Sequence, residues 1–159
     1  MKSKTLKLGL FCLVFALVGA SCQNDDLSSQ EDKQLSVVEV NTIGCKENLK
    51  STDTEQYIQL TAEGENQLRL KFINAVLNCC PGEISGNAFI ANDILKVVFT
   101  EETPALCNCI CCFDLECVID LMENRTYNIE VYAGSDIAKA KFSFNYSSDL
   151  NSRIDITKP

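Results

Sequence analysis

Residues 113–121, FDLECVIDL, decide the fold class of this chain. Apolar and polar side chains alternate along this stretch with a period of two, as in a β-strand that buries one face. The inward set is Phe113, Leu115, Cys117, Ile119 and Leu121, and the outward set is Asp114, Glu116, Val118 and Asp120. A helix needs apolar residues three and four positions apart, and no segment of the body sustains that spacing.

The same alternation recurs on both sides of this stretch. It covers residues 127–131 and 140–146 downstream and residues 68–77 upstream, and residues 94–99 form a β-branched run. Turn residues separate these runs at spacings of about ten residues, which is typical of an antiparallel sandwich. The sequence therefore predicts an all-β, antiparallel β-sandwich of about seven strands. We place this domain at residues 35–150 and a C-terminal tail at residues 151–159.

One local motif narrows the fold. Residues 121–133, LMENRTYNIEVYA, resemble the corner between strands E and F of fibronectin type III and other immunoglobulin-like domains. There a leucine ends strand E, and a tyrosine opens strand F and bonds back to the corner backbone. Leu121 and Tyr127 have the family's separation, and Asn124 and Thr126 suit the turn. The resemblance implies an immunoglobulin-like sandwich; the alternative is that Tyr127 simply begins a strand.

Composition excludes several functions. The 159 residues include ten cysteines but no histidine and no tryptophan, and the formal charge is −8. Without histidine, Ser-His-Asp and Cys-His catalysis and histidine-ligated zinc are excluded. The acidic balance argues against nucleic acid as a partner.

The N-terminus has the pattern of an export signal. Lys2, Lys4 and Lys7 precede an uncharged apolar run from Leu8 to Val18, which is short for a transmembrane span. Small residues follow at positions 19–21, so we expect residues 1–21 to be a cleaved signal peptide. A short membrane anchor that stays in place is the alternative.

Cys22 indicates lipidation. Residues 18–22, VGASC, resemble the lipobox of bacterial lipoproteins, in which the cysteine is acylated and becomes the mature N-terminus. Gly19 departs from that pattern, which usually has leucine or valine there. Residues 23–26, QNDD, resemble the acidic export signal of surface lipoproteins of the Bacteroidota type. The resemblance implies a palmitate-type anchor on Cys22 in the outer membrane, with the chain on the cell surface; ordinary secretion with cleavage near Cys22 is the alternative.

Residues 22–34 are expected to form a disordered tether behind this anchor. They are polar and acidic, with almost no apolar content to offset the entropy of ordering. Removing the signal peptide also removes Lys2, Lys4 and Lys7, so 11 basic residues remain against 22 acidic residues.

Eight cysteines remain once Cys12, in the signal peptide, and Cys22 are set aside. They are Cys45, Cys79, Cys80, Cys107, Cys109, Cys111, Cys112 and Cys117. In an exported protein, two to four disulfides are the simplest interpretation. Cysteines two apart on one strand point in parallel and bond poorly to each other. We therefore expect at least one bridge from the Cys79–Cys80 pair to the cluster at residues 107–112.

A thiolate metal site and free thiols are the alternatives to disulfides. The six densest cysteines would suit Cu(I), zinc or an iron–sulfur centre; they are Cys79, Cys80, Cys107, Cys109, Cys111 and Cys112. Structural zinc sites favour cysteines two to four residues apart, whereas this sequence has C-x-C and adjacent pairs.

The sequence thus predicts a lipid-anchored, surface or periplasm-facing envelope lipoprotein that binds or displays, without catalysis and without a cofactor. Its expected partners are the membrane, through Cys22, and a protein or glycan ligand. Asp114, Glu116 and Asp120 share a strand face, which we interpret as solvated. Stacking on sugars would need tyrosines, of which Tyr57, Tyr132 and Tyr146 are the candidates. A thiolate metal-binding envelope protein and an enzyme inhibitor with a rigid loop are the competing functions.

Overall fold

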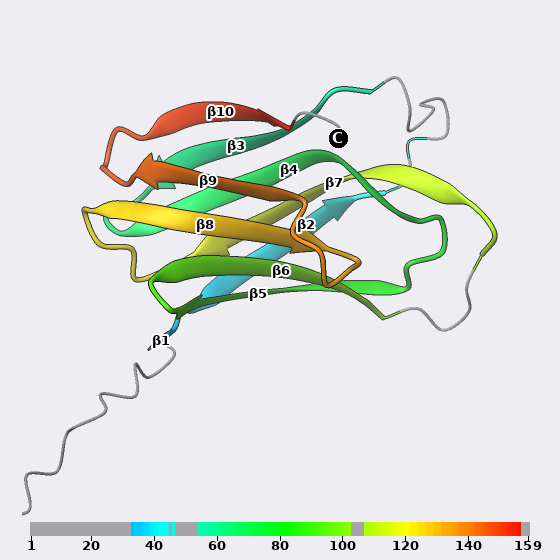
Figure 1. Cartoon of the computed structure of the whole chain (residues 1–159), viewed down its shortest axis with the longest axis horizontal. Helices are drawn as coiled ribbons and strands as arrows, with labels where there is room; N and C mark the ends of the chain where they lie inside the picture. Colours follow the sequence, from blue (N-terminus) through cyan, green and yellow to red (C-terminus); the bar gives the residue numbers. More distant parts are fainter. Residues whose placement is uncertain (1–32, 45, 47–53, 103–106, 157–159) are drawn as a thin grey trace, which may run out of the picture.

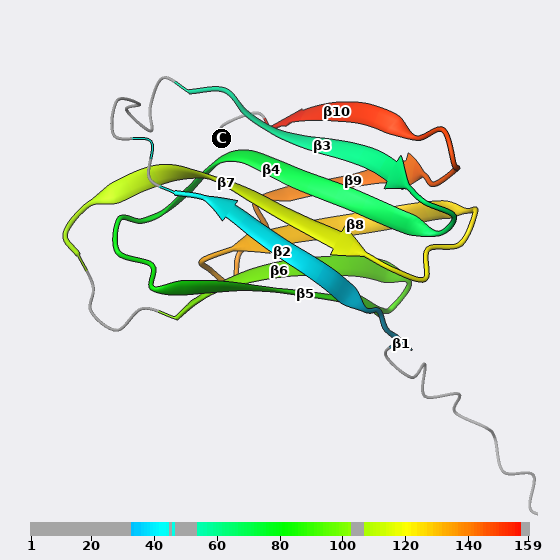
Figure 2. The same cartoon turned by 180° about the vertical axis from the view of Figure 1, so that it is seen from behind.

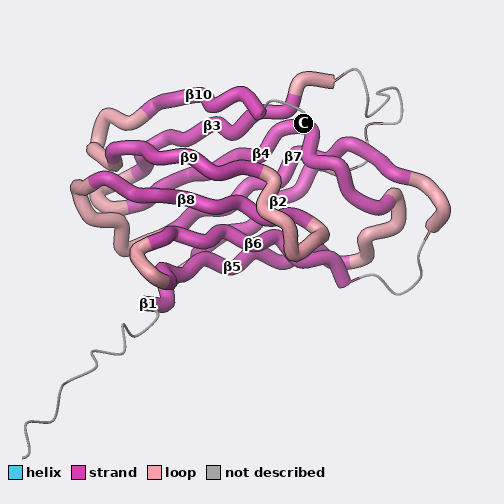
Figure 3. Tube along the Cα trace, viewed as in Figure 1, coloured by secondary structure: helices cyan, strands magenta, loops and turns pink. Residues whose placement is uncertain are grey.

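A computed structural model describes residues 33–44, 46, 54–102 and 107–156, which fold into two five-stranded β-sheets. Figures 1 and 2 show one sheet in front of the other from opposite sides, and Figure 3 shows that strands make up most of the body. All the regular elements in these residues are strands, so the predicted all-β sandwich is confirmed. Within the same residues, no helix has the length and apolarity to cross a bilayer.

The first sheet has the order β1-β5-β6-β8-β9 and the second the order β10-β3-β4-β7-β2. The strands of the first sheet are β1 (Lys33–Gln34), β5 (Glu83–Ala91), β6 (Ile94–Glu102), β8 (Thr126–Ala133) and β9 (Ala140–Asn145). Those of the second are β10 (Asn151–Ile156), β3 (Gln56–Glu63), β4 (Gln67–Asn78), β7 (Ile110–Ile119) and β2 (Val37–Ile43).

Strand β7 confirms the alternation that decided the fold. Leu115, Cys117 and Ile119 are buried in the layer between the sheets, together with side chains from β3, β4, β6 and β8. The inward pattern ends earlier than the sequence predicts, because Leu121 lies beyond β7 and is 55% exposed. Its backbone has a positive φ of 65°, which turns the chain and lets Met122 take the buried position instead.

One strand pair departs from the antiparallel prediction: β6 and β8 pair in parallel. The reason is the path of the chain, since β7 lies between them in sequence but belongs to the other sheet. The chain leaves β6, runs back along the opposite layer as β7, and returns as β8 in the direction of β6. The other strand pairs recorded in the two sheets are antiparallel.

The sandwich is longer at both ends than predicted, and its described residues form ten strands where about seven were expected. Residues 33–34, assigned to the tether, pair with β5 as β1. Residues 151–156, assigned to a tail, form β10 and pair with β3 along their whole length. Ile154 and Ile156 explain this, because they alternate with exposed polar residues and pack against the core.

Tyr127 is buried at the start of β8, and its hydroxyl accepts a hydrogen bond from the backbone N–H of Glu123 at 2.9 Å. This bond ties the loop after β7 to the strand that follows it. It is the kind of bond that the immunoglobulin-like corner would supply. The resemblance to that family stays a prediction.

Asp114 and Glu116 project from the outer face of the second sheet, where both are held in ion pairs. Lys46 Nζ lies 2.6 Å from Asp114, and Lys71 Nζ lies 2.7 Å from Glu116. Arg69 also pairs with Glu116. Burial alone would raise the pKa of Glu116, but the hydrogen bonds and positive charges of Lys71 and Arg69 outweigh it, so the pKa lies below its ordinary value.

We predict that Tyr127→Phe lowers the free energy of unfolding by about 1 kcal/mol, because it removes the hydrogen bond between the buried Tyr127 hydroxyl and the Glu123 N–H. Tyr57→Phe is the control, since the Tyr57 side chain is only half-buried and has no recorded hydrogen bond through its hydroxyl. Urea denaturation followed by circular dichroism measures both. Equal effects of the two substitutions would contradict the role given to the Tyr127 hydroxyl.

We also predict that Glu116→Gln makes the free energy of unfolding depend less on pH between pH 7 and pH 3. A lowered pKa in the folded state gives stability that is complete above the unfolded pKa and is lost as the pH falls through the folded pKa. The variant should therefore be less stable than the wild type at pH 7 and converge with it below about pH 4. Glu65→Gln, at an exposed turn position, is the control. Urea titrations from pH 7 to pH 3 that give parallel curves for Glu116→Gln and the wild type would refute this assignment.

Candidate functional site: the cysteine-braced end of the sandwich

The two ends of the sandwich differ in what they carry. β1 pairs with Phe89 and Ile90 near the turn between β5 and β6, so the described chain begins at that end. Cys79 and Cys80, which directly follow β4, and the cysteines before β7 belong to the opposite end, since Figure 1 shows β1 at one end and the end of β4 and the start of β7 at the other. We call this opposite end, with the residues 78–83, 100–102, 107–110 and 133–139, the cysteine end.

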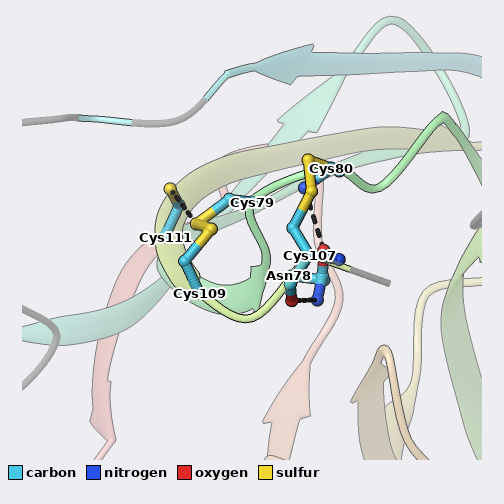
Figure 4. Close-up of a disulfide and its surroundings, with 6 residues drawn as sticks. All are labelled: Asn78, Cys79, Cys80, Cys107, Cys109 and Cys111. Carbon is cyan, nitrogen blue, oxygen red and sulfur yellow. Dashed lines mark hydrogen bonds between the residues drawn. A yellow bond between two sulfur atoms is a disulfide. The ribbon is translucent and has the colours of Figure 1, made fainter. Parts of the chain in front are cut away.

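Two disulfides join the end of β4 to the segment that leads into β7. Cys79 is bonded to Cys109 and Cys80 to Cys107, with Cα–Cα separations of 5.6 and 5.8 Å. Figure 4 shows the two bonds side by side. The predicted bridge from the Cys79–Cys80 pair to the cluster at residues 107–112 is confirmed, and it is double.

Asn78 reinforces this junction without a covalent bond. Its side-chain amide donates to the carbonyl of Cys107 at 2.7 Å, and its Oδ1 accepts from the backbone N–H groups of Cys80 and Cys107. The backbone of Cys79 donates in addition to the carbonyl of Cys109. The end of β4 and the residues before β7 are therefore connected at every position from 78 to 80.

The other cysteines have separate positions. Cys111 is disulfide-bonded, and its Sγ lies 3.0 Å from the Sγ of Cys79. Cys112 and Cys117 are free thiols buried in the sandwich. Burial, with the nearby charge of Glu116, raises the pKa of Cys117 to about 12. Cys45 lies outside the described residues, as do Cys12 and Cys22.

Four of the six cysteines proposed as ligands of a metal are paired in these two disulfides. A metal of the predicted kinds is held by thiolates, and Cys79, Cys80, Cys107 and Cys109 carry no thiolate while they are paired. In the described ranges, no group of three or more cysteine or acidic side chains is arranged to hold an ion.

A pocket of about 600 Å³ opens between the sheets at the cysteine end. The buried side chains of Leu77, Phe99 and Ala133 form part of its wall, and Asn78 and Ile110 line it next to the disulfides. Its volume lies in the range of ligand pockets. Ile110 is 62% exposed, so one large apolar side chain borders the pocket at its open side. Ile137, in the turn after β8, is 77% exposed but does not line the pocket.

Glu101 is the unexpected residue in this pocket. The inward positions of β6 are Leu95, Val97 and Phe99, all fully buried, and Glu101 is the next position on the same face. A carboxylate thus stands where the alternation calls for an apolar side chain. Among the described residues, no ion pair or side-chain hydrogen bond of Glu101 is recorded, whereas Glu116 on the outer face has two cationic partners.

Gly134 makes room for this carboxylate. Its φ is +61°, and a Cβ at this position would collide with Oε1 of Glu101 and lie 2.9 Å from Leu77. Only glycine adopts that backbone conformation without strain and also leaves the space open. From the sequence, Glu101 and Glu102 stand out only as adjacent carboxylates, interpreted as solvated, and Gly134 carries no signal. The alternation of residues 95–101 indicates that Glu101 is on the inward face of its strand. It does not indicate where the facing sheet ends, so the sequence alone could not place Glu101 in a pocket.

The tyrosines proposed for sugar stacking do not come together. Tyr146 is buried, and its hydroxyl donates to the carbonyl of Gln67. Tyr57 lies on the second sheet with Arg153 3.8 Å above its ring. Tyr132 lies on the first sheet and donates to Glu130 at 2.5 Å. None of the three lines the pocket at the cysteine end.

Comparisons of this chain with protein-family models, with curated proteins and with solved structures found no match.

We predict that alkylation of the folded, unreduced protein leaves Cys112 and Cys117 unmodified, because both side chains are buried and the pKa of Cys117 is raised. Denaturation without reductant should expose both to alkylation, and Cys79, Cys80, Cys107 and Cys109 should react only after reduction. Peptide mapping by mass spectrometry measures each site. Alkylation of the last four cysteines without reductant, with metal found by elemental analysis, would contradict the disulfide assignment.

Proposed function

We propose that this chain is a lipid-anchored envelope lipoprotein with a binding or display role, and that its cysteine end is the surface that contacts a protein or glycan ligand. The anchor is an acylated Cys22 in the outer membrane, with the body on the cell surface or facing the periplasm. The immunoglobulin-like character of the sandwich belongs to the same proposal. The role is one of binding without catalysis or cofactor.

The observation that carries this proposal is the opposite placement of β1 and the pocket. An anchor before β1 sits at one end of the sandwich, so the cysteine end faces away from the bilayer. A chain extends by at most about 3.3–3.6 Å per residue, so residues 23–32 allow a stand-off of up to roughly 35 Å. An acyl chain contributes about 0.8 kcal/mol per buried CH₂, and two or three chains hold such a body stably on a membrane.

The rigidity of the cysteine end supports a binding role. A disulfide contributes roughly 2–4 kcal/mol by restricting the unfolded chain. Two of them at one junction, with the hydrogen bonds of Asn78, fix the wall of the pocket. A preorganised site loses less entropy on binding than a flexible one.

The sequence has no histidine, and the carboxylates that share a strand face are held by ion pairs or a hydrogen bond; both facts favour binding over catalysis. Asp114 and Glu116, which share a strand face, are taken up in ion pairs, and Asp120 accepts a hydrogen bond from the backbone of Leu121. A pair of carboxylates that serves as acid and base needs instead to converge across a cleft.

We predict that Cys22→Ala moves the protein from the membrane fraction to the soluble fraction when the full chain is expressed in a Gram-negative host. Cys12→Ala is the matched control, because Cys12 leaves with the signal peptide and its loss should not change fractionation. Detergent phase partition followed by mass spectrometry of the N-terminal peptide measures anchor and acylation together. Unchanged fractionation of Cys22→Ala, or an unmodified Cys22 in the membrane-bound wild type, would overturn the anchor.

A further inference from the structure

We infer that the pocket at the cysteine end binds a basic side chain, lysine or arginine, that a protein partner presents on an apolar segment. This inference deepens the proposed function, on which it rests, by naming the chemistry of the ligand. It starts from Glu101, a carboxylate on the core-facing side of β6 at the open end of the sandwich.

A cation would compensate the half-buried carboxylate of Glu101. A carboxylate beside buried apolar groups is poorly solvated, and structures normally compensate it with a partner. The outer face of the sandwich shows this rule, since Glu116 there pairs with Lys71 and Arg69. No such partner is recorded for Glu101 among the residues that the structure describes. Local rules are broken in this way mainly at functional sites.

The electrostatics of the pocket favour a cation. Its charged lining consists of Glu101 and Asp136 against the single ammonium of Lys139. Lys139, directly before β9, is exposed, whereas Glu101 is half-buried between the sheets. The chain as a whole is acidic, with a formal charge of −8, so long-range attraction also favours a basic partner.

The walls of the pocket favour a long side chain with an apolar stem. Leu77, Phe99 and Ala133 supply apolar surface next to the carboxylate. Lysine and arginine bury their methylene stems along such surface while the charged head reaches a partner. The exposed Ile110, which lines the pocket, would be covered by an apolar residue next to the basic one. These features together favour a protein segment over a small free amine.

Gly134 gives the site its geometry. The missing Cβ lets the Glu101 carboxylate lie across the end of β8, where a larger residue would collide with it. The disulfides hold the neighbouring wall in place through Asn78, which also lines the pocket. The carboxylate is therefore presented from a fixed frame.

The test uses the full mature chain with Cys22→Ala and a capped peptide, acetyl-Gly-Trp-Arg-Leu-Gly-amide. Because the chain has no tryptophan, the fluorescence of the peptide reports binding selectively. The matched peptide carries citrulline, a neutral analogue of arginine of nearly the same shape. We expect the arginine peptide to bind about tenfold more tightly than the citrulline peptide, as a charge-assisted contact requires.

The variants locate the site. Glu101→Gln should lower the affinity for the arginine peptide about tenfold, so that the arginine and citrulline peptides bind equally well. Glu102→Gln is the control, because it makes the same charge change at the next residue, which is exposed and does not line the pocket. It should leave affinity within about twofold of the wild type. Urea denaturation confirms that both variants are folded.

Three outcomes would overturn the inference: no binding of the arginine peptide at about 1 mM, a weak affinity by any measure; equal binding of the two peptides; or equal effects of Glu101→Gln and Glu102→Gln. None of these outcomes bears on the lipid anchor at Cys22, because the fractionation of Cys22→Ala tests the anchor separately. A failure of the ligand assignment is thus distinguishable from a failure of the proposed function.

Discussion

Side chains from both sheets meet in one apolar layer, and the rest of the structure depends on where this layer begins and ends. Phe72 and Leu115 from one sheet and Leu95 and Phe99 from the other are fully buried in it. Each such side chain contributes about 1.5–3 kcal/mol when it leaves water. At the end of the sandwich that carries the turn between β5 and β6, which we call the turn end, Met122 and Tyr127 fill the layer. At the cysteine end the layer stays open.

The two ends consequently have different means of stabilisation. At the turn end, packing and the bond from Glu123 to Tyr127 hold the loop after β7. At the cysteine end, the apolar layer stops at Phe99, and covalent bonds from Cys79 and Cys80 replace packing as the constraint. This division leaves a pocket with a fixed wall at the end that lies away from β1.

The strands were largely predictable from the sequence, but their partners were not. Alternation of residues 113–117 follows from local burial on one face, and the structure reproduces it, whereas Val118, expected on the outer face, is buried. The parallel pairing of β6 with β8 depends on β7 crossing to the other sheet, which no local pattern encodes. β10 shows the same alternation in residues 151–156, yet it is short and polar on one face, and it was assigned to a tail.

The site was predictable only in part, for the same reason. Cysteines two apart on a strand bond poorly to each other, so bridges from Cys79 and Cys80 could be expected, although their partners could not be named. Glu101 lies on β6 and Gly134 directly follows β8, and their importance depends on the contact between them. Such a contact exists only after β6 and β8 have paired.

Amide hydrogen exchange on oxidised and reduced protein tests most directly the claim that disulfides fix the cysteine end while the apolar layer holds the fold. Upon reduction, residues 78–80 and 107–110 should exchange faster, because the bonds that join these two segments are covalent. The amides of β3, β4 and β8 away from that end should keep their protection, since burial rather than the disulfides stabilises them. Uniform loss of protection across all strands, or no change at the cysteine end, would contradict the account.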